Sequence, residues 1–354
     1  MHRLRTDDLD YPLDPACVAT VPAEPRDSAR MMIVHRDGGE VVHARVRDLP
    51  GWLRAGDLMV ANHTKVAPVR FEGVRVADAR PFEGLFVAPV GERSWTALIK
   101  GAKRLRSGDR IELHGATGER AQVVARERQD ESWVIDFPGA PTPILESVGR
   151  APLPPYILGA RRERQESVDE ARDRERYQTV YAQALSRPSV AAPTAGLHVT
   201  GELLQTLRRQ DVGWTSVELQ VGLGTFKPVE TEWLDEHPMH SEWCRIEPSA
   251  LDAVLSTRST GGRVIAVGTT SVRVLESLPV PPTSGEFDTR LMIAPGHGFR
   301  LVDGLLTNFH LPRSTLLALV GAMVGLERLK SLYAEAQREG YRFYSYGDCM
   351  LILP

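Results

Sequence analysis

The chain has few cysteines, and their positions exclude two common uses. Its three cysteines, Cys17, Cys244 and Cys349, are odd in number and far apart in the sequence. They can form neither a disulfide framework nor a Cys-x-x-Cys metal or redox motif. We therefore expect a protein of a reducing compartment, with a cytoplasmic location.

Long hydrophobic segments are also missing. The first eight residues carry basic side chains with no apolar run behind them, so the sequence predicts no secretory signal peptide. The most apolar stretch, residues 315–326, is bounded by Arg313 and Glu327 and is much shorter than the ~20 residues that span a bilayer. We expect a soluble protein with no membrane partner.

A large excess of charge of one sign is absent as well. The 43 Lys and Arg residues and 46 Asp and Glu residues give a net charge of −3. This balance argues against chain-wide electrostatic attraction to nucleic acid, but it is compatible with a local basic patch. With 42% hydrophobic residues among 354, the chain has an ordinary globular composition, and its length suggests two domains at roughly 150 residues each.

Six short β-rich segments follow one another between Val69 and Phe137. They are separated by Gly, Pro or charged residues and cover residues 69–76, 84–90, 94–100, 109–115, 121–127 and 132–137. Strands at this spacing predict a small barrel or sandwich. The proline-rich stretch that follows, around Pro152 and Pro154, is typical of a crossing between domains.

Helix and strand patterns alternate in the remainder of the chain. Apolar residues from Tyr177 to Leu185 at i, i+3, i+4, i+7 and i+8 predict an amphipathic helix. The later segments are strands at 215–221 and 263–268, helices at 249–258 and 271–278, a long helix at about 314–338 and a final strand near 341–348. The mixed-charge run at 161–176 predicts an exposed helix or a disordered lead-in. The alternation predicts βα units on a largely parallel sheet.

Strand patterns at 30–36 and 57–62 resemble this later part more than the barrel. The sequence therefore predicts an α/β fold, with one discontinuous α/β domain formed by residues 1–67 and 151–354. A small β-barrel domain, residues 68–150, is inserted into it. No fixed-period repeat is present, which argues against a solenoid.

A strand, a Gly-Thr-Thr turn and a helix at 263–277 predict an anion site. The free N–H groups of the helix N-terminus, the hydroxyls of Thr269 and Thr270, and Arg273 one turn later suit a carboxylate or phosphate. A plain helix cap is the alternative interpretation. The tract VGLGTF at 221–226 has neither the third glycine of a dinucleotide fingerprint nor the Gly-Lys-Ser/Thr of a P-loop.

Three further segments carry histidines. AAPTAGLH ends at His198 and TNFHLP contains His310, and both are predicted to be rigid loops, although a lone histidine is commonly structural. His237, His240 and Glu242 in HPMHSEWC could bind a metal, share protons or lie on a solvated loop. Metal binding is the least favoured, because a proline interrupts the cluster and no second thiolate is near.

One basic loop and one aromatic tract remain. The loop KGAKRLR, residues 100–106, has four cations without an intervening acid and is the best candidate for contacting phosphates; a solvated loop is the alternative. Four aromatic residues between Tyr341 and Tyr346 could stack on a base or fill a core.

Together these segments resemble the S-adenosylmethionine:tRNA ribosyltransferase-isomerase family of queuosine biosynthesis. The resemblance is carried, in the order of the family, by LPPYI, YQTVYA, AAPTAGLH, VGLGTFKPVE, HPMHSE, VIAVGTTSVRVLES, APGHGF, TNFHLPRSTLLALV and YRFYSYGD. YPLDP, RDSARMMIV, GDLMVANHTKV and KRLRSGD match more loosely in the N-terminal half. The family is known for an α/β domain with an inserted barrel, which agrees with the architecture predicted above.

The resemblance implies a reaction. The ribosyl part of S-adenosylmethionine is transferred to 7-aminomethyl-7-deazaguanine at the tRNA wobble position and rearranges to an epoxycyclopentanediol, giving epoxyqueuosine-tRNA, while adenine and methionine leave. The sulfonium acidifies the C5′ hydrogens, so a positioned base could form an ylide-like centre that expels adenine. S-adenosylmethionine is the co-substrate and tRNA the partner. No permanently bound cofactor or metal is required, and we expect a monomer.

Roles for individual residues follow from the family motifs and this chemistry. His240 and Glu242 are the predicted acid/base groups, with His198 and His310 lining the same pocket. The predicted substrate-binding residues are Thr194, Gly196, Gly222, Gly224, Thr225, Thr269, Thr270, Arg273, Asn308, Tyr346 and Asp348. The predicted tRNA-binding residues are Lys100, Lys103, Arg104 and Arg106.

The sequence departs from the family pattern at several positions. It has Gln220 where the family usually has His, and Val199, Lys65 and Met31-Met32 where the family has Phe, Arg and paired leucines. A divergent relative that binds tRNA, or acts on another nucleoside without this reaction, is therefore the alternative function. An S-adenosylmethionine-dependent RNA methyltransferase is disfavoured, because no Gly-rich loop lies near the start of the α/β region.

Overall fold

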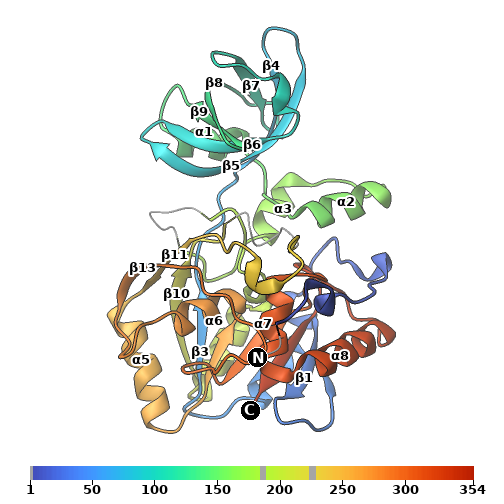
Figure 1. Cartoon of the computed structure of the whole chain (residues 1–354), viewed down its shortest axis with the longest axis vertical. Coiled ribbons are helices and arrows are strands. Elements are labelled where there is room, and N and C mark those ends of the chain that lie inside the picture. The colour runs from blue at the N-terminus through green and yellow to red at the C-terminus, as the bar shows by residue number, and fades with distance from the viewer. Residues whose placement is uncertain (1–2, 184–188, 223–228) are drawn as a thin grey trace.

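The computed structural model describes residues 3–183, 189–222 and 229–354, and it consists of a barrel above a larger sheet with helices (Figure 1). The sheet has nine strands: β1 (Arg30–His35), β2 (Val42–Arg45), β3 (Leu58–Asn62), β10 (Gly213–Leu219), β11 (Glu242–Ile246), β12 (Val264–Val267), β13 (Gly285–Thr289), β14 (Gly304–Asn308) and β15 (Cys349–Leu353). The fold is therefore the predicted α/β type with a β-barrel.

The strands of the large sheet run in the order β13-β11-β10-β3-β12-β14-β15-β1-β2. The central strands β10, β3, β12 and β14 are parallel, as is the β1–β15 pair. The other four pairings are antiparallel. The prediction of a largely parallel sheet is thus wrong outside the centre. The short turn between β1 and β2 shows one reason, since such a turn can join only antiparallel strands.

Both faces of the sheet centre are buried. In β3, alternate apolar side chains pack on opposite faces. Leu58 and Val60 belong to a hydrophobic cluster that also contains residues of α5 (Pro248–Ser259), α6 (Thr269–Glu276), α7 (Thr315–Val324) and α8 (Leu326–Arg338). Met59 and Ala61 point to the other face, where α4 (Gly201–Arg209) packs. Because successive strand residues alternate between faces, a continuous apolar run is what a strand covered on both sides requires.

The barrel lies in the chain between two parts of this sheet. It closes in the order β4-β5-β6-β9-β8-β7, and the strands are β4 (Arg70–Arg75), β5 (Pro81–Gly91), β6 (Ser94–Ile99), β7 (Arg110–His114), β8 (Arg120–Gln129) and β9 (Ser132–Asp136). β3 leads into it, and α1 (Pro141–Val148) follows it. All six predicted strands are confirmed. The domain boundaries at 67/68 and 150/151 stay a prediction.

Two helix predictions need correction. α3 (Glu170–Arg176) ends before the expected helix at Tyr177, because Tyr177 and Tyr181 pack into different clusters instead of forming one stripe. Ala184 and Leu185 lie outside the described residues. The long helix expected at 314–338 is two helices, α7 and α8, separated at Gly325, whose φ of 82° is incompatible with a continuous right-handed helix.

The charged run at 161–176 is neither fully exposed nor disordered. It spans the end of α2 (Pro155–Glu163) and α3, and Arg161 forms a buried ion pair with Asp173. The Arg161 guanidinium also donates to the carbonyl of Thr20. Arg161 therefore links α2 and α3 to the N-terminal segment at Thr20, although the sequence pattern suggested a solvent-exposed run.

The last strand lies beyond the predicted segment. β15 begins at Cys349, whereas 341–348 forms turns in which Tyr344 has a φ of 72°. The Asp348 carboxylate accepts hydrogen bonds from the backbone N–H groups of Arg30 and Arg342, which fixes these turns against β1. Among the described residues, no helix is long and apolar enough to cross a membrane.

Candidate functional site

The C-terminal ends of the four central parallel strands meet at one edge of the sheet, and the candidate site lies there. Ligands of open α/β sheets bind outside this edge, where the loops after the strands converge. β12 is followed by Gly268 and α6, and β14 ends at Asn308. The chain also passes from β3 into the barrel at this edge, so the barrel extends from the same side of the sheet (Figure 1).

One pocket, which we call the Arg273 pocket, lies between the start of β11, the N-terminus of α6 and α7. It has about 600 Å³ of space, part of it open to solvent. Its lining residues are His237, Met239, His240, Glu242, Thr269, Thr270, Arg273, Leu291, Met292, Ile293, Thr315, Leu316 and Leu319. The pocket thus brings together six residues that the sequence singled out from two separate segments, 237–242 and 269–273.

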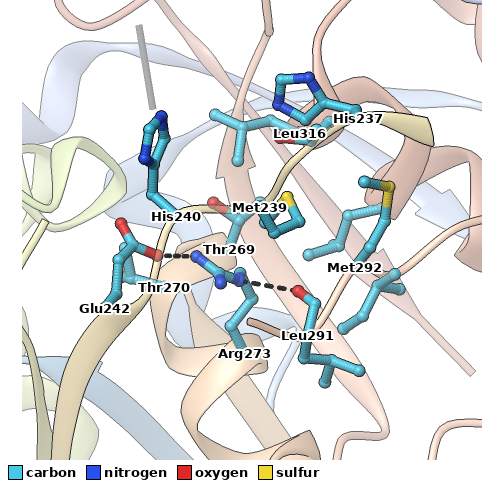
Figure 2. Close-up of a pocket in the computed structure, with 13 residues that line it drawn as sticks. His237, Met239, His240, Glu242, Thr269, Thr270, Arg273, Leu291, Met292 and Leu316 are labelled. Atoms are coloured by element: carbon cyan, nitrogen blue, oxygen red, sulfur yellow. Dashed lines mark hydrogen bonds and ion pairs between the residues drawn. The ribbon is translucent and has the colours of Figure 1, made fainter. Parts of the chain in front are cut away.

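Arg273 is the charged centre of this pocket (Figure 2). It is 8% exposed, its Nη1 donates to the Glu242 carboxylate, and its Nε donates to the carbonyl of Leu291 over 3.2 Å. Its Nη2 has no partner among the described residues. Burial lowers the pKa of Arg273 to about 10, so the side chain is still cationic at neutral pH.

The N-terminus of α6 adds further donors. Gly268 precedes the helix with a φ of 86°, a conformation that glycine adopts without strain, and Thr269 is the first helical residue. The Thr270 hydroxyl is buried and has no hydrogen-bond partner in the described part of the chain. The unsatisfied N–H groups of a first helical turn attract anions, so the geometry is compatible with the predicted anion site, which stays a prediction.

A second pocket, the Asn308 pocket, adjoins the first. Both are lined by Thr269, Thr270 and Leu316, so the two pockets lie side by side, and we refer to them together as the cleft. Its other lining residues are Tyr156, Ala191, Ala192, Pro193, Thr194, Ala195, Val221, Gly268, Thr307, Asn308, Phe309, His310, Leu311, Tyr344 and Ser345. Tyr156 and Tyr344 give it aromatic walls, and its space of about 600 Å³ is partly open to solvent.

His198 and His310 are both buried in a way that changes their predicted chemistry. Burial lowers the pKa of His198 to about 4 and that of His310 to about 3. The Nε2 of His198 lies 3.2 Å from the Asn308 amide nitrogen, and the Nε2 of His310 lies 2.8 Å from the Thr307 hydroxyl. The argument that these histidines titrate near neutrality is therefore wrong, and both are neutral hydrogen-bonding groups. His310 lines the Asn308 pocket, whereas His198 sits behind Asn308.

His240 and Glu242 lie close together but in different environments. His240 is exposed at the mouth of the Arg273 pocket, while Glu242 is 6% exposed and begins β11. Besides Arg273, the Glu242 carboxylate accepts a hydrogen bond from the backbone N–H of Gly222 over 3.2 Å. The expected separation of roles between these two side chains thus has a physical basis.

Several other predicted site residues stand apart from these pockets. Gly196 lies against the Tyr181 hydroxyl and has no room for a side chain. Tyr346 packs edge-on against Tyr177, and Asp348 is occupied with backbone N–H groups. Gly224 and Thr225 lie outside the described residues.

The basic loop lies on the barrel, between β6 and β7. Lys100, Lys103, Arg104 and Arg106 are all exposed, and Lys103 and Arg104 form a short 3-10 helix. Lys100 pairs with Glu83 of β5. The loop is thus an accessible basic surface, separate from the cleft.

Two features of this sheet edge were not predicted from the sequence. Tyr156 and Tyr344 form a pair in the wall of the Asn308 pocket, 4.7 Å apart between ring centroids. His63 follows β3 and lies 3.6 Å from Glu218. Burial lowers the pKa of His63. The position of His63 directly after β3 was an available signal, whereas no local pattern pairs Tyr156 of α2 with Tyr344. Among the described residues, no group of three or more His, Cys, Asp and Glu side chains is placed to hold a metal ion.

Comparisons with known proteins agree with this architecture. The chain matches the model of a family described as queuosine biosynthesis protein over residues 6–352. Proteins named S-adenosylmethionine:tRNA ribosyltransferase-isomerase are 45% identical in Rhizorhabdus wittichii, covering 99% of this chain and 100% of that protein, and 47% identical in Gloeobacter violaceus, covering 99% and 96%. The crystal structure of S-adenosylmethionine tRNA ribosyltransferase from Thermotoga maritima is similar with a TM-score of 0.54 and 31% identity, covering 98% of this chain and all of that one. The chain belongs to the queuosine biosynthesis protein family.

Proposed function

We propose that this protein is an S-adenosylmethionine:tRNA ribosyltransferase-isomerase. The observation that carries the proposal is the match to relatives of that name at 45–47% identity over nearly the full length of both chains. In the proposed reaction, the ribosyl part of S-adenosylmethionine is transferred to the aminomethyl group of a 7-deazaguanine in tRNA and isomerised, with loss of adenine and methionine. These relatives do not favour the alternative of a binding protein without this reaction.

The Arg273 pocket suits the methionine carboxylate of S-adenosylmethionine. The free Nη2 of Arg273, the hydroxyl of Thr270 and the N–H groups at the start of α6 are donors for one anion. Hydrogen bonds between charged groups in a buried site contribute about 1.5–3 kcal/mol each. Met239, Met292 and Leu316 give the same pocket apolar walls for the thioalkyl chain.

His240 is the proposed proton-transfer group. An imidazole is the side chain that exchanges protons near neutral pH, and His240 lines the pocket from its exposed rim. Removal of a C5′ proton beside the sulfonium leaves an electron pair that can drive expulsion of adenine, which itself takes up a proton. Glu242 has a second role, because its ion pair fixes the Arg273 guanidinium.

The exposed loop at 100–106 is the proposed contact for tRNA phosphates. Its cations are on the barrel, and the barrel emerges from the sheet edge that carries both pockets. A tRNA held on the barrel could then present its modified base to the cleft. S-adenosylmethionine is a co-substrate in this scheme, no permanently bound cofactor is required, and we still expect a cytoplasmic monomer.

Product analysis tests the proposed function. The protein is incubated with S-adenosylmethionine and a tRNA that carries 7-aminomethyl-7-deazaguanine, and the small molecules are separated by chromatography. We expect adenine and methionine. S-adenosylhomocysteine would instead identify a methyltransferase, and tRNA binding without any turnover would identify a binding protein.

A further inference from the structure

We propose that the Asn308 pocket binds the adenine of S-adenosylmethionine, and that Asn308 Oδ1 selects this base by accepting a hydrogen bond from its 6-amino group. The inference rests on the proposed function, because it assumes this co-substrate. It adds a residue that determines specificity, an atom of that residue, and the part of the ligand that the atom recognises.

The first step is the orientation of the Asn308 amide. Its nitrogen Nδ2 lies 3.1 Å from the carbonyl oxygen of Tyr344, which can only accept a hydrogen bond. The amide nitrogen must therefore be on this side. The other N–H faces His198 Nε2 over 3.2 Å. Both amide hydrogens are used, so the amide is held in one orientation.

The second step concerns the state of His198. Its Nε2 can accept from Asn308 only if the ring is neutral with the proton on Nδ1. Burial favours this state, because it lowers the pKa of His198 to about 4. His198 thus acts as a positioning residue that keeps the Asn308 amide from turning over.

The third step concerns the amide oxygen of Asn308, Oδ1. Asn308 is 2% exposed, lines the pocket, and its Oδ1 has no partner among the described residues. A buried acceptor without a donor costs free energy, so a ligand that supplies an N–H gains from filling it. The pocket therefore favours a ligand with a hydrogen-bond donor next to Asn308 Oδ1 and disfavours a ligand with an acceptor there.

Two features identify the donor as adenine. Tyr156 and Tyr344 line the pocket with aromatic side chains, which suit the flat face of a base. The Asn308 pocket also lies next to the Arg273 pocket, with Thr269 and Thr270 lining both. One ligand with a carboxylate at one end and an aminopurine at the other suits two such neighbouring pockets, and S-adenosylmethionine has this form.

The test compares S-adenosylmethionine with its 6-oxo analogue, S-inosylmethionine, by calorimetric binding without tRNA. The 6-oxo group places an acceptor where the amino donor would be. We expect the wild-type protein to bind the 6-amino compound about 10- to 100-fold more tightly. In Asn308→Ala, this ratio should fall close to one. Equal binding of both compounds by the wild-type protein would overturn the proposal without any variant.

Asn62→Ala is the matched control, because Asn62 is the other asparagine of the chain and is fully buried. Its amide nitrogen donates to the carbonyl of Leu219, and its oxygen accepts from the backbone N–H groups of Thr64 and Leu219. Asn62 lines neither pocket. Loss of this amide should lower stability but leave the binding ratio unchanged. A ratio reduced equally in Asn62→Ala would contradict a specific role for Asn308.

His198 variants test the positioning role. His198→Ala should reduce the ratio because one amide hydrogen loses its acceptor, and His198→Gln should restore it because a carboxamide oxygen can accept in its place. If Asn308→Ala weakens tRNA binding and leaves the ratio intact, the pocket holds a tRNA base and the proposal is wrong. Failure of the wild-type protein to release adenine would instead contradict the proposed function, since the binding ratio is measured without turnover.

Discussion

Arg273 and Glu242 form a buried ion pair that occupies only part of the guanidinium. Nη1 faces Glu242 and Nε faces the carbonyl of Leu291, whereas Nη2 has no partner among the described residues. A buried donor without an acceptor costs free energy, so this arrangement is most favourable when a ligand oxygen accepts from Nη2. Glu242 thus orients Arg273 for binding, and the ligand completes the hydrogen bonding of the guanidinium.

Replacing Arg273 with Ala should weaken S-adenosylmethionine binding. The loss of one or two charge-assisted hydrogen bonds corresponds to about a 10- to 100-fold increase in Kd, while tRNA affinity should be unchanged. Calorimetry with each ligand measures both. Arg258→Ala removes an ion pair with Asp303 on the surface and is the control. Unchanged affinity for both ligands in Arg273→Ala would refute the anion site.

Glu242→Gln should weaken S-adenosylmethionine binding by less than Arg273→Ala does. The two carboxylate oxygens of Glu242 accept from Gly222 N–H and from Arg273 separately, so the single amide oxygen of glutamine can keep only one of these hydrogen bonds and carries no charge. The guanidinium itself remains in the pocket, which is why the effect should be the smaller one. Adenine release at saturating co-substrate should remain measurable. A loss of chemistry as large as that of a proton-transfer group, with normal affinity, would make Glu242 the base instead.

His240→Ala should lower single-turnover adenine release about 10²- to 10⁴-fold with little change in the affinity for either substrate. The reason is that a proton-transfer group acts on the reacting atoms and contributes little to binding. His35→Ala, a histidine at the end of β1 away from the cleft, is the control. Normal chemistry in His240→Ala would remove this residue from the mechanism.

His198 predicts a pH dependence of stability. Its folded pKa of about 4 lies below the ordinary value of 6.5, so between these values the unfolded chain binds a proton that the folded chain does not. The free energy of unfolding should therefore fall as the pH drops from 6.5 to 4, by up to about 3 kcal/mol from this group. Urea unfolding of wild type and His198→Gln across this range measures it, and the same slope in both proteins would contradict the assignment.

Changing Lys103 and Arg104 together to Ala should weaken tRNA binding and reduce its salt dependence by about one phosphate contact per residue. Lys330 and Arg338, cations on α8, provide the control pair. Binding measured at several salt concentrations gives the slope. If the slope is unaltered in the barrel variant, the loop is only a solvated surface.

Local sequence patterns predicted the fold well where the residue types of a short segment determine its backbone structure. The six barrel strands follow from alternation, and the break between β12 and α6 follows from Gly268, although α6 begins at Thr269, two residues before the predicted start. The patterns failed where tertiary contacts decide. Tyr177 and Tyr181 have helical spacing but enter different cores, and Arg161 looks solvated until its buried partner Asp173 is known.

The candidate site shows the same division. Residue types and motifs singled out Thr270, Arg273 and His240 as candidates, because hydroxyl and guanidinium groups bind anions and an imidazole can transfer protons. They could not show that His198 is fully enclosed or that its ring faces Asn308, since burial depends on segments more than 100 residues apart. The pKa argument for His198 therefore failed, and a role for this residue in the site stays a prediction.

The most direct test of the account uses S-adenosylmethionine labelled with ¹⁴C in its ribose and with ³H in its methyl group, together with tRNA that carries 7-aminomethyl-7-deazaguanine. Ribosyl transfer predicts that ¹⁴C enters the tRNA in equal amount to the adenine released, while ³H leaves with methionine. Incorporation of ³H into the tRNA, with ¹⁴C retained in S-adenosylhomocysteine, would contradict the proposed function.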